Sequence, residues 1–378
     1  MNQISFKDIN SPFFIFYPEK LKKKIRQFTK YFEGRVVYAL KANPSKPILN
    51  LLKKCGVDSF DAASLNEIKL IKAIIPNSNV FFMNPIKSRK SIKEAYFKYK
   101  VRNFSLDSLE EYKKILYETN HAKDLSIFVR LSIPSKFSVV SLDSKFGMNK
   151  VAASKLIKII KKKISKVGIC FHVGSQCMNP QIYKTAIKIS KDVEKSSGVD
   201  LDYLNVGGGF PSYYENYKQV NLSDYISYVN KNFLKVFCNK CSEVKLLAEP
   251  GRSIVSDCMS LVVKVNHRKN NSLFINDGIY GSLNNAGKFN FIYPAKLFGR
   301  KDTTSKLIPF SFYGPTCDSA DFIKGPFYLP NSVSEGDYIE LFNMGAYSTT
   351  MKTDFNGFFK KTEFFIKKDD NWKIEQIT

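Results

Sequence analysis

Short apolar runs alternate with amphipathic stretches from about residue 35 to about residue 255. The amphipathic stretches repeat their apolar residues at helical spacing, and the apolar runs have the length of strands. Alternation of this kind is typical of a parallel sheet covered by helices. Eight strands are predicted, at residues 35–42, 57–63, 80–84, 103–106, 126–133, 166–173, 203–206 and 245–248. Helices are predicted between them, among others at residues 47–55, 65–74, 152–164, 182–194 and 222–234. Eight such units favour a closed (β/α)8 barrel, a TIM barrel, over an open doubly wound sheet.

The pattern changes after about residue 257, where helical spacing nearly disappears and short strands joined by turns take over. Strands are predicted at residues 260–266, 273–276, 307–313, 337–343 and 362–366. This predicts an all-β domain, either a sandwich or a partly closed barrel, to which the apolar run at 13–17 would add an N-terminal strand. We therefore expect an α/β chain with a barrel over 20–256 and a β domain made of 1–19 and 257–378.

The formal net charge of +25 often indicates a nucleic-acid or membrane partner. Here the lysines fall on the predicted helices, as in Lys161-Lys162-Lys163. Arginine, which phosphate and groove contacts favour, occurs only eight times. No basic stripe with interleaved aromatic residues is found. We therefore expect no nucleic acid and no membrane as partner.

The seven cysteines include one CxxC spacing, from Cys238 to Cys241, and are otherwise scattered, without a second Cys or His pair to complete a metal site. Reduced thiols and no metal are expected from this pattern. No apolar run approaches the roughly 20 residues of a membrane helix. Residues 1–8 lack the basic and apolar segments of a signal peptide. We expect a cytoplasmic protein.

Lys41 lies in an apolar, strand-like run, Val36-Val37-Tyr38-Ala39-Leu40-Lys41. Burying an ammonium there costs several kcal/mol unless something compensates. A lysine in such a place is expected to have a lowered pKa and a nucleophilic amine, as Schiff-base chemistry needs. A lysine whose ammonium reaches solvent at the strand end is the alternative. The other strand ends favour the first interpretation.

Polar residues and glycines stand at the ends of six predicted strands, the edge at which TIM-barrel enzymes carry their chemistry. They are Lys41, Asp61, Arg130, His172, Gly207-Gly208-Gly209 and Glu249. The glycines let backbone N–H groups approach a phosphate, although a sterically required turn would look the same. Glu249 and Arg252 would suit a protonated ring nitrogen and a phosphate, with a surface ion pair as the alternative.

Two segments of the expected β domain carry further candidates. Gly314-Pro315-Thr316-Cys317-Asp318 places a thiol beside a carboxylate in a turn. Thiol chemistry depends on exposure and on the thiolate fraction, so a buried structural cysteine is the alternative here. Asn343-Met344-Gly345-Ala346-Tyr347 presents a tyrosine after a glycine turn, where core packing is the alternative.

Together these segments resemble the fold-type III pyridoxal-phosphate decarboxylases of basic amino acids, the alanine-racemase-like group, and most closely its ornithine decarboxylases. The resemblance spans about residues 10–360. Eight motifs occur in the family's order, at residues 39–43, 60–64, 171–175, 206–211, 249–252, 276–282, 314–318 and 343–347.

The resemblance implies pyridoxal 5'-phosphate as cofactor and a role for each motif residue. Lys41 would carry the cofactor on its amine, and Glu249 would keep the ring nitrogen protonated, so that the ring withdraws electrons. His172 would stack on the ring, and Asp61 and Arg130 would support Lys41 and the ring. The phosphate would be held by Ser175, Gly208, Gly209, Gly251, Arg252 and Tyr347.

The resemblance also implies a homodimer with shared active sites. Cys317 of the partner subunit would return a proton to the α-carbon. Asp318 of the partner subunit would bind the distal ammonium of the substrate, with Tyr280 as a further substrate contact. Lys145 and Asp321 would pair across the interface.

One departure from the family concerns the substrate. Ornithine decarboxylases usually place a second acidic residue eight or nine positions beyond the tyrosine that corresponds to Tyr280. No carboxylate occurs from Gly281 to Pro294, and Lys288 stands near the expected place. A cation facing the substrate ammonium would be repulsive. Either Lys288 points to solvent or the substrate is not ornithine.

The leading hypothesis is α-decarboxylation of a basic L-amino acid, with L-ornithine giving putrescine and CO2 in polyamine biosynthesis. The alternatives within the class are lysine, arginine, diaminopimelate and carboxynorspermidine. The segment 314–318 lacks the longer Glu-containing motif of diaminopimelate decarboxylases, and racemisation would need a tyrosine acid on the opposite face. A different alternative is an inactive regulatory homologue that binds a partner protein. Such homologues lose cofactor residues, which are all present here.

Overall fold

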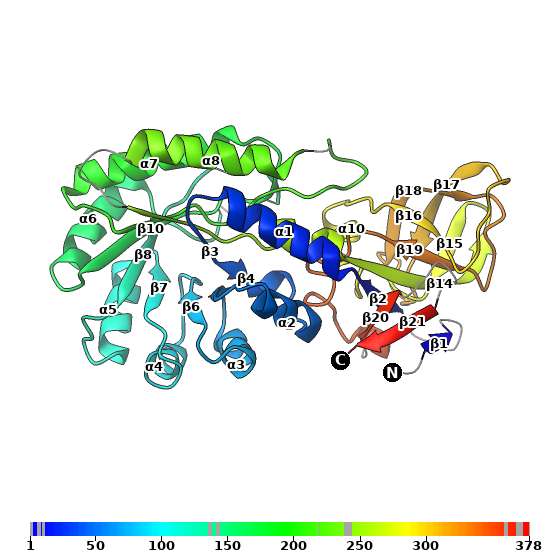
Figure 1. The fold of residues 1–378 in the computed structure, drawn as a ribbon, viewed down its shortest axis with the longest axis horizontal. Helices are drawn as coiled ribbons and strands as arrows, with labels where there is room; N and C mark the ends of the chain where they lie inside the picture. Colours follow the sequence, from blue (N-terminus) through cyan, green and yellow to red (C-terminus); the bar gives the residue numbers. More distant parts are fainter. Residues whose placement is uncertain are drawn as a thin grey trace.

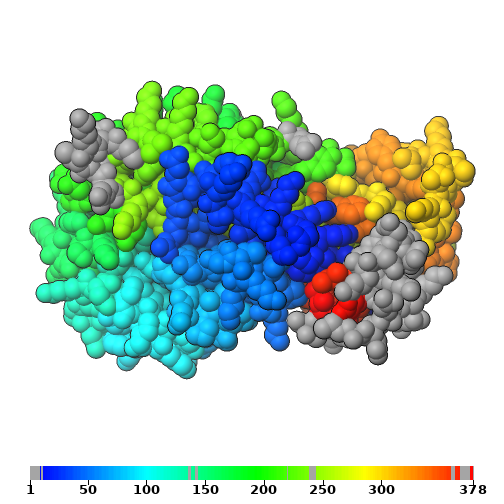
Figure 2. Space-filling view, viewed as in Figure 1, coloured from blue at the N-terminus to red at the C-terminus, as the bar shows by residue number. Residues whose placement is uncertain are grey.

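The computed structural model describes residues 3–5, 9, 12–134, 138–140, 144–218, 220–237, 244–358, 362–367 and 373–377. Figure 1 shows a barrel ringed by helices at one end of the molecule and a set of β-strands at the other. Helix α1 (Pro18–Tyr31) runs from the strands along the barrel, so the N-terminal segment connects both parts. The space-filling view shows the same helix lying across the face of the molecule, with the barrel on one side and the β part on the other (Figure 2).

The barrel is a closed parallel sheet. Its strands are β3 (Arg35–Val36), β4 (Tyr38–Ala39), β5 (Ser59–Ala62), β6 (Asn79–Phe82), β7 (Asn103–Leu106), β8 (Ser126–Arg130), β10 (Lys166–Cys170), β12 (Tyr203–Asn205) and β13 (Lys245–Ala248). The sheet begins with β3 and ends with β4, which are two pieces of one strand interrupted at Val37. Backbone bonds from Val37 to Ala248 (2.8 Å) and from Ala39 to Pro250 (3.2 Å) close the seam. The predicted (β/α)8 barrel is confirmed.

Amphipathic helices cover the barrel. After α1 they are α2 (Lys46–Lys54), α3 (Leu65–Ile74), α4 (Arg89–Phe97), α5 (Leu109–Glu118), α6 (Lys150–Lys161), α7 (Gln181–Ser197) and α8 (Leu222–Phe237). Ser64, Ser88 and Ser108 each accept a backbone N–H of the first helical turn, which fixes where α3, α4 and α5 begin. Helix α7 ends at Gly198, in the left-handed conformation that glycine adopts without a steric penalty.

The first predicted strand, 35–42, is wrong in its second half. The strand ends at Ala39, and the 3-10 turn η2 (Leu40–Ala42) carries Lys41. The carbonyl of Lys41 accepts the hydroxyl of Thr350 (3.1 Å), and that of Ala42 accepts the N–H of Tyr347 (2.7 Å). These carbonyls bond a segment from the other end of the chain and not a neighbouring strand, so the extended pairing stops there.

The β part is a second sheet. Its main path is β1 (Gln3–Ser5), β21 (Lys373–Ile377), β20 (Glu363–Lys367), β2 (Phe13–Phe16), β14 (Met259–Lys269), β15 (Ser272–Ile275), β17 (Leu307–Tyr313) and β18 (Phe322–Pro330). Strand β19 (Tyr338–Leu341) joins β14 and carries β16 (Ala295–Phe298) on its other side. The predicted N-terminal strand is confirmed, because β2 pairs antiparallel with β14. Strands β1, β16, β18 and β21 were not predicted from the sequence.

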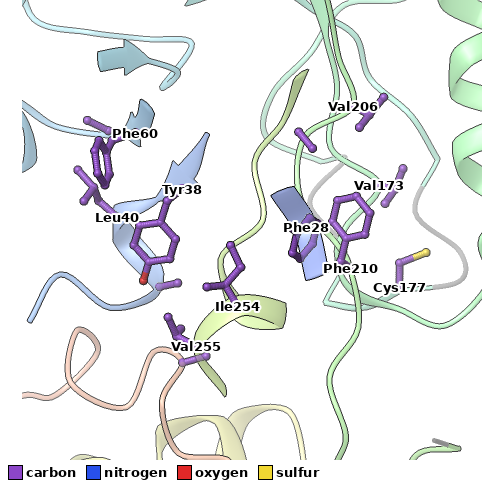
Figure 3. Packing of buried hydrophobic residues seen from close by; sticks show 14 of the residues in the cluster. Phe28, Tyr38, Leu40, Phe60, Val173, Cys177, Val206, Phe210, Ile254 and Val255 are labelled. Carbon is purple, nitrogen blue, oxygen red and sulfur yellow. The ribbon is translucent and has the colours of Figure 1, made fainter. Parts of the chain in front are cut away.

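Buried aromatic and aliphatic side chains support the turn that carries Lys41. Tyr38 and Leu40 are fully buried, and the ring of Tyr38 packs edge-on against Phe60, with ring centroids 6.4 Å apart. On the other side of this region Phe28 of α1 packs edge-on against Phe210, beyond the glycine turn (5.4 Å). Figure 3 shows both groups, with Ile254 and Val255 between them. Closely packed side chains therefore support both the turn that carries Lys41 and the glycine turn.

Candidate active site

Lys41 and Asp61 form the first contact of the site. Lys41 stands on η2 directly after β4, and Asp61 lies on the adjacent strand β5, in register with Ala39. The ammonium of Lys41 is 3.0 Å from a carboxylate oxygen of Asp61. The Asp61 side chain is 2% exposed and the Lys41 side chain 40% exposed. The lysine therefore has an anionic partner within the barrel and an open side toward solvent.

The expectation of a lowered pKa for Lys41 is wrong for this structure. Burial alone would lower the pKa, but Asp61, with further contributions from Tyr347 and Glu249, raises it above its ordinary value. The apolar run around Lys41 indicates burial alone. The carboxylates that the barrel brings toward the amine come from distant parts of the sequence and leave no signal near Lys41.

Glu249 follows β13, and its carboxylate points into the same region. Its side chain is buried, and one carboxylate oxygen accepts a hydrogen bond from the side-chain amide of Asn205 at 2.6 Å. Burial, and next the charge of Asp61, raise the pKa of Glu249 to about 7. This carboxyl group can therefore hold or give up a proton near neutral pH.

His172 presents a neutral ring. The N–H of Gly174 donates to its Nδ1 at 3.0 Å, so this nitrogen is an acceptor. Burial, with the charges of Arg130 and Lys41, lowers the pKa of His172 well below its usual range. A Cβ on Gly208 would lie 2.9 Å from Nε2 of the ring, so the glycine turn packs against the imidazole.

Arg252 lies at the start of the short helix α9 (Arg252–Val255) and is fixed by polar and aromatic contacts. Its guanidinium donates to the hydroxyl of Tyr214 at 2.7 Å and to that of Ser175 at 3.3 Å. The rings of Phe291 and Tyr347 lie with their centroids 4.9 Å from the guanidinium carbon. A cation held against ring faces keeps its orientation and its charge.

A second cluster stands on the β part, around Asp318. The hydroxyl of Tyr280 donates to the carboxylate of Asp318, and this bond holds the pKa of Asp318 below its ordinary value. The neighbouring Cys317 is exposed, and its N–H donates to the side-chain carbonyl of Asn356 at 3.3 Å. Within the described residues of one chain, no contact joins Cys317 or Asp318 to Lys41.

Asp321 shapes the turn that carries this cluster. It is 2% exposed and accepts the N–H of Ile279 (2.8 Å) and the hydroxyl of Thr316 (2.8 Å). Lys145 is exposed, and its ammonium lies over the ring of Phe146. The predicted pairing of Lys145 with Asp321 across a subunit interface stays a prediction.

Residues 18–256 match the family described as "Pyridoxal-dependent decarboxylase, pyridoxal binding domain". The chain belongs to this family. It is therefore a carboxy-lyase that uses pyridoxal phosphate.

The relatives of this decarboxylase include two decarboxylases and an antizyme inhibitor. It is 29% identical to a lysine/ornithine decarboxylase from Selenomonas ruminantium, over 93% of this chain and 89% of the relative. It is 31% identical to an ornithine decarboxylase from Panagrellus redivivus, over 87% of this chain and 79% of the relative. It is 28% identical to antizyme inhibitor 2 from Xenopus laevis, over 100% of this chain and 86% of the relative.

A solved structure shares the whole fold. The arginine decarboxylase of Paramecium bursaria Chlorella virus superposes with a TM-score of 0.84 at 27% identity, covering 95% of this chain and 96% of that one. In the described part of the chain, no helix is long and apolar enough to cross a membrane.

The residues of this decarboxylase fit the cofactor. A Cβ on Gly208 would lie 2.8 Å from the Glu249 carbonyl oxygen, and a Cβ on Gly209 would lie 2.6 Å from that of Gly174. Only glycine leaves backbone N–H groups open at such a turn. The hydroxyl of Ser253, next to Arg252, is buried and has no hydrogen-bond partner among the described residues. The glycine turn and Arg252 together suit a phosphate.

Sequence reasoning missed several residues of the site. Asn205 precedes the glycine turn, Tyr214 and Phe291 enclose Arg252, and Asn356 holds the backbone of Cys317. Each comes into place through tertiary contacts without a local signal. Glu67 does have a local signal in the sequence, because Ser64 and Glu67 have the spacing of a capping box. In the structure the Glu67 carboxylate accepts the N–H of Ala63 at 2.6 Å.

The segment that lacks the second acidic residue forms helix α10 (Asn284–Lys288). Lys288 is exposed, and its ammonium lies over the ring of Phe289, 5.5 Å from the centroid. Of the two predicted alternatives, this position agrees with a lysine that points to solvent. It leaves the substrate open.

Proposed function

We propose that this decarboxylase removes CO2 from the α-carbon of a basic L-amino acid, with L-ornithine, which gives putrescine, as the leading substrate. The observation that carries the proposal is Asp318, a carboxylate whose lowered pKa keeps it ionised, beside the exposed thiol of Cys317. A fixed anion at the end of a site favours a substrate with a cationic tail. Relatives named for lysine, ornithine and arginine decarboxylation support this substrate class.

The barrel residues bind and orient the cofactor. Pyridoxal phosphate, when bound, withdraws electrons from the α-carbon, so that the bond to CO2 can break. Lys41 would hold the cofactor through its amine, with Asp61 and Arg130 as the charged groups beside it. His172 would lie against the ring as a neutral, flat surface, which its lowered pKa favours.

The phosphate group would be held by the glycine turn and by Arg252. Gly208, Gly209 and Gly251 offer backbone close to the binding region, because none has room for a side chain. Ser175 and Tyr347 already contact the guanidinium of Arg252, so they would complete the cradle. Tyr347 adopts a φ of 66°, which is uncommon for a residue with a side chain and places its ring against the arginine.

Glu249 would face the ring nitrogen. With a pKa of about 7, its carboxyl group can give its proton to that nitrogen and keep it by a charge-assisted hydrogen bond. A carboxylate in this place makes the ring a stronger acceptor of electrons.

We propose that two chains share each site. Cys317 and Asp318 make no contact with Lys41 among the described residues of one chain, so a second copy would supply them. The partner's Cys317 would give a proton to the α-carbon after CO2 leaves, and the partner's Asp318 would bind the distal ammonium. Lys145 and Asp321 would then lie on the interface.

The experiment that tests the proposal measures CO2 release and amine product from purified protein with added pyridoxal phosphate. Ornithine, lysine, arginine, meso-diaminopimelate and carboxynorspermidine are compared. Preference for ornithine is the expected result. Preference for another substrate would keep the reaction and place the specificity in the segment 284–290. Cofactor binding without turnover of any of the five would contradict the proposed substrate class.

The inactive regulator is the second candidate, because one relative is an antizyme inhibitor. Lys41, His172, Glu249, Arg252 and Cys317 are all present, which argues for an enzyme. Failure to bind pyridoxal phosphate at all would favour the regulator.

A further inference from the structure

Asn205 is the last residue of β12 and is fully buried, with both ends of its side-chain amide in use. Its amide nitrogen donates to Oε1 of Glu249 at 2.6 Å. Its carbonyl oxygen accepts the N–H of Gly207 at 2.9 Å. The side chain therefore connects the proposed partner of the ring nitrogen to the proposed phosphate turn.

The orientation of this amide is fixed by chemistry. A backbone N–H can only donate, so the carbonyl oxygen of Asn205 must face Gly207, and the NH2 group must face Glu249. A further backbone bond, from the N–H of Glu249 to the carbonyl of Gly207 (2.8 Å), holds the two segments at this spacing. Oε1 of Glu249 is thereby engaged, and no hydrogen bond within the described residues reaches Oε2. Oε2 is the oxygen left for the cofactor.

Asn205 also differs from the other groups that act on Glu249. Asp61 raises the pKa of Glu249, whereas Lys41, Arg130 and Asn205 lower it. Of these, Asn205 is the one in direct hydrogen-bond contact, and it is neutral. A neutral donor favours the carboxylate form without adding a charge that would compete with a ring cation.

We propose that Asn205 is a positioning residue that sets two cofactor contacts at once, directing Oε2 of Glu249 to the ring nitrogen and fixing Gly207 so that Gly208 and Gly209 can receive the phosphate. This inference rests on the proposed role of Glu249. It predicts that the two functions of the amide can be separated by substitution.

The variants separate the donor from the acceptor. Asn205→Asp keeps an oxygen for the N–H of Gly207 but loses the donor to Glu249. Asn205→Ala loses both. Asn230→Asp is the matched control, because Asn230 is also buried and also bonds two ways, donating to the carbonyl of Tyr31 (2.6 Å) and accepting the N–H of Glu33 (3.2 Å), outside the site.

The experiment measures equilibrium binding of pyridoxal phosphate and of 1-deaza-pyridoxal phosphate, in which carbon replaces the ring nitrogen. Thermal unfolding of each cofactor-free variant checks that it is folded. For Asn205→Asp we expect the dissociation constant of pyridoxal phosphate to rise about tenfold, a change of about 1.4 kcal/mol. The dissociation constant of the deaza analogue should stay within twofold of its value for the wild-type protein. Asn205→Ala should weaken both ligands, because the phosphate turn loses its support.

The outcomes distinguish this inference from the proposal on which it rests. Glu249→Gln should weaken pyridoxal phosphate more than the analogue. If Glu249→Gln weakens the binding of neither ligand, the assigned role of Glu249 is wrong, and the inference about Asn205 is overturned as well. If Glu249→Gln discriminates while Asn205→Asp affects both ligands equally, or no more than Asn230→Asp, then Asn205 is structural and the inference alone is overturned.

Discussion

The ammonium of Lys41 lies 3.0 Å from the carboxylate of Asp61, and this contact determines the charge of the amine before any cofactor binds. Asp61 is buried at 2% exposure, so water screens the interaction little. Burial is the largest single influence on the pKa of Lys41 and lowers it, but Asp61, Tyr347 and Glu249 together raise this pKa above its ordinary value. Lys41 is therefore a cation at neutral pH, and it must lose a proton before its nitrogen can attack a carbonyl group.

Asp61→Asn should lower the pKa of Lys41, because burial then acts with less opposition from a neighbouring charge. The sign follows from the protonation state. A lower pKa means more neutral amine at a given pH, so Lys41 should react faster with an amine-modifying reagent between pH 7 and 9. The measurement is the pH dependence of Lys41 modification in the cofactor-free protein, followed by mass spectrometry of the peptide that carries it.

Lys41→Ala is the control for that signal, and it should also abolish covalent capture of pyridoxal phosphate and turnover. An unchanged cofactor absorbance in Lys41→Ala would remove the assignment of this lysine. A pH dependence of modification that is the same in Asp61→Asn and wild type would show that Asp61 does not control the amine.

Tyr280→Phe should weaken substrate binding through Asp318. The tyrosine hydroxyl donates to the carboxylate and is the main cause of its lowered pKa. Without that donor the pKa should rise toward its ordinary value, and the carboxylate should lose its fixed orientation. We expect KM for the basic amino acid to rise about two- to fivefold with little change in kcat, since the exposed contact is a modest one. Steady-state kinetics on the preferred substrate, with Tyr313→Phe as control, measure the effect. A loss confined to kcat would contradict this role.

Mixing two inactive variants tests the shared site. Lys41→Ala removes a barrel residue, whereas Cys317→Ala removes the proposed proton donor of the partner subunit. If each site uses Lys41 of one chain and Cys317 of the other, half of the mixed population is heterodimer with one intact site. Activity should then recover to about a quarter of wild type. Recovery should be absent when either variant is mixed with an inactive chain that carries both substitutions. No recovery in the first mixture, with heterodimers shown to form, would place both residues in the same chain's site.

The barrel and most of its rim could be predicted because they depend on local patterns. The strand ending near Asp61 and the glycines after β12 follow from apolar runs and turn residues, and both lie where they were expected. The end of the first strand could not be predicted. The carbonyls of η2 are engaged by residues 347 and 350, which are about 300 positions away and give no signal near Lys41.

The same limit applies to the residues that orient the site. Asn205 gains its importance from Glu249, which follows the neighbouring strand β13, and Phe291 gains its importance from Arg252. The residues around Asn205 and around Phe291 do not indicate these roles on their own. The raised pKa of Lys41 belongs to this class as well, because a charge balance depends on all the groups that the fold brings together.

A buried ion pair away from the cofactor residues gives the last prediction, on stability. The ammonium of Lys87 is fully buried, lies 3.0 Å from the carboxylate of Glu111 and donates to the carbonyl of Ser105 at 2.6 Å. Glu111 also bonds the ammonium of Lys114 at 2.5 Å. Lys87→Met would leave the buried carboxylate with one charged partner. We expect it to lower the free energy of unfolding by about 3 kcal/mol, as for other broken buried pairs. Urea denaturation measures this, with Lys22→Met, from the exposed pair with Glu19, as a control that should cost less than about 1 kcal/mol.

The pH dependence of this pair has a definite sign. Burial lowers the pKa of Lys87 to about 8, from an ordinary value of 10.5. Between these values the unfolded chain binds more protons at this lysine than the folded chain, so the free energy of unfolding gains a positive slope with pH. The loss caused by Lys87→Met should therefore grow as the pH rises from 8 toward 10.5. A loss that shrinks over this range would mean that the folded protein holds the proton of Lys87 more tightly than the unfolded chain does, and Glu111 would then outweigh burial.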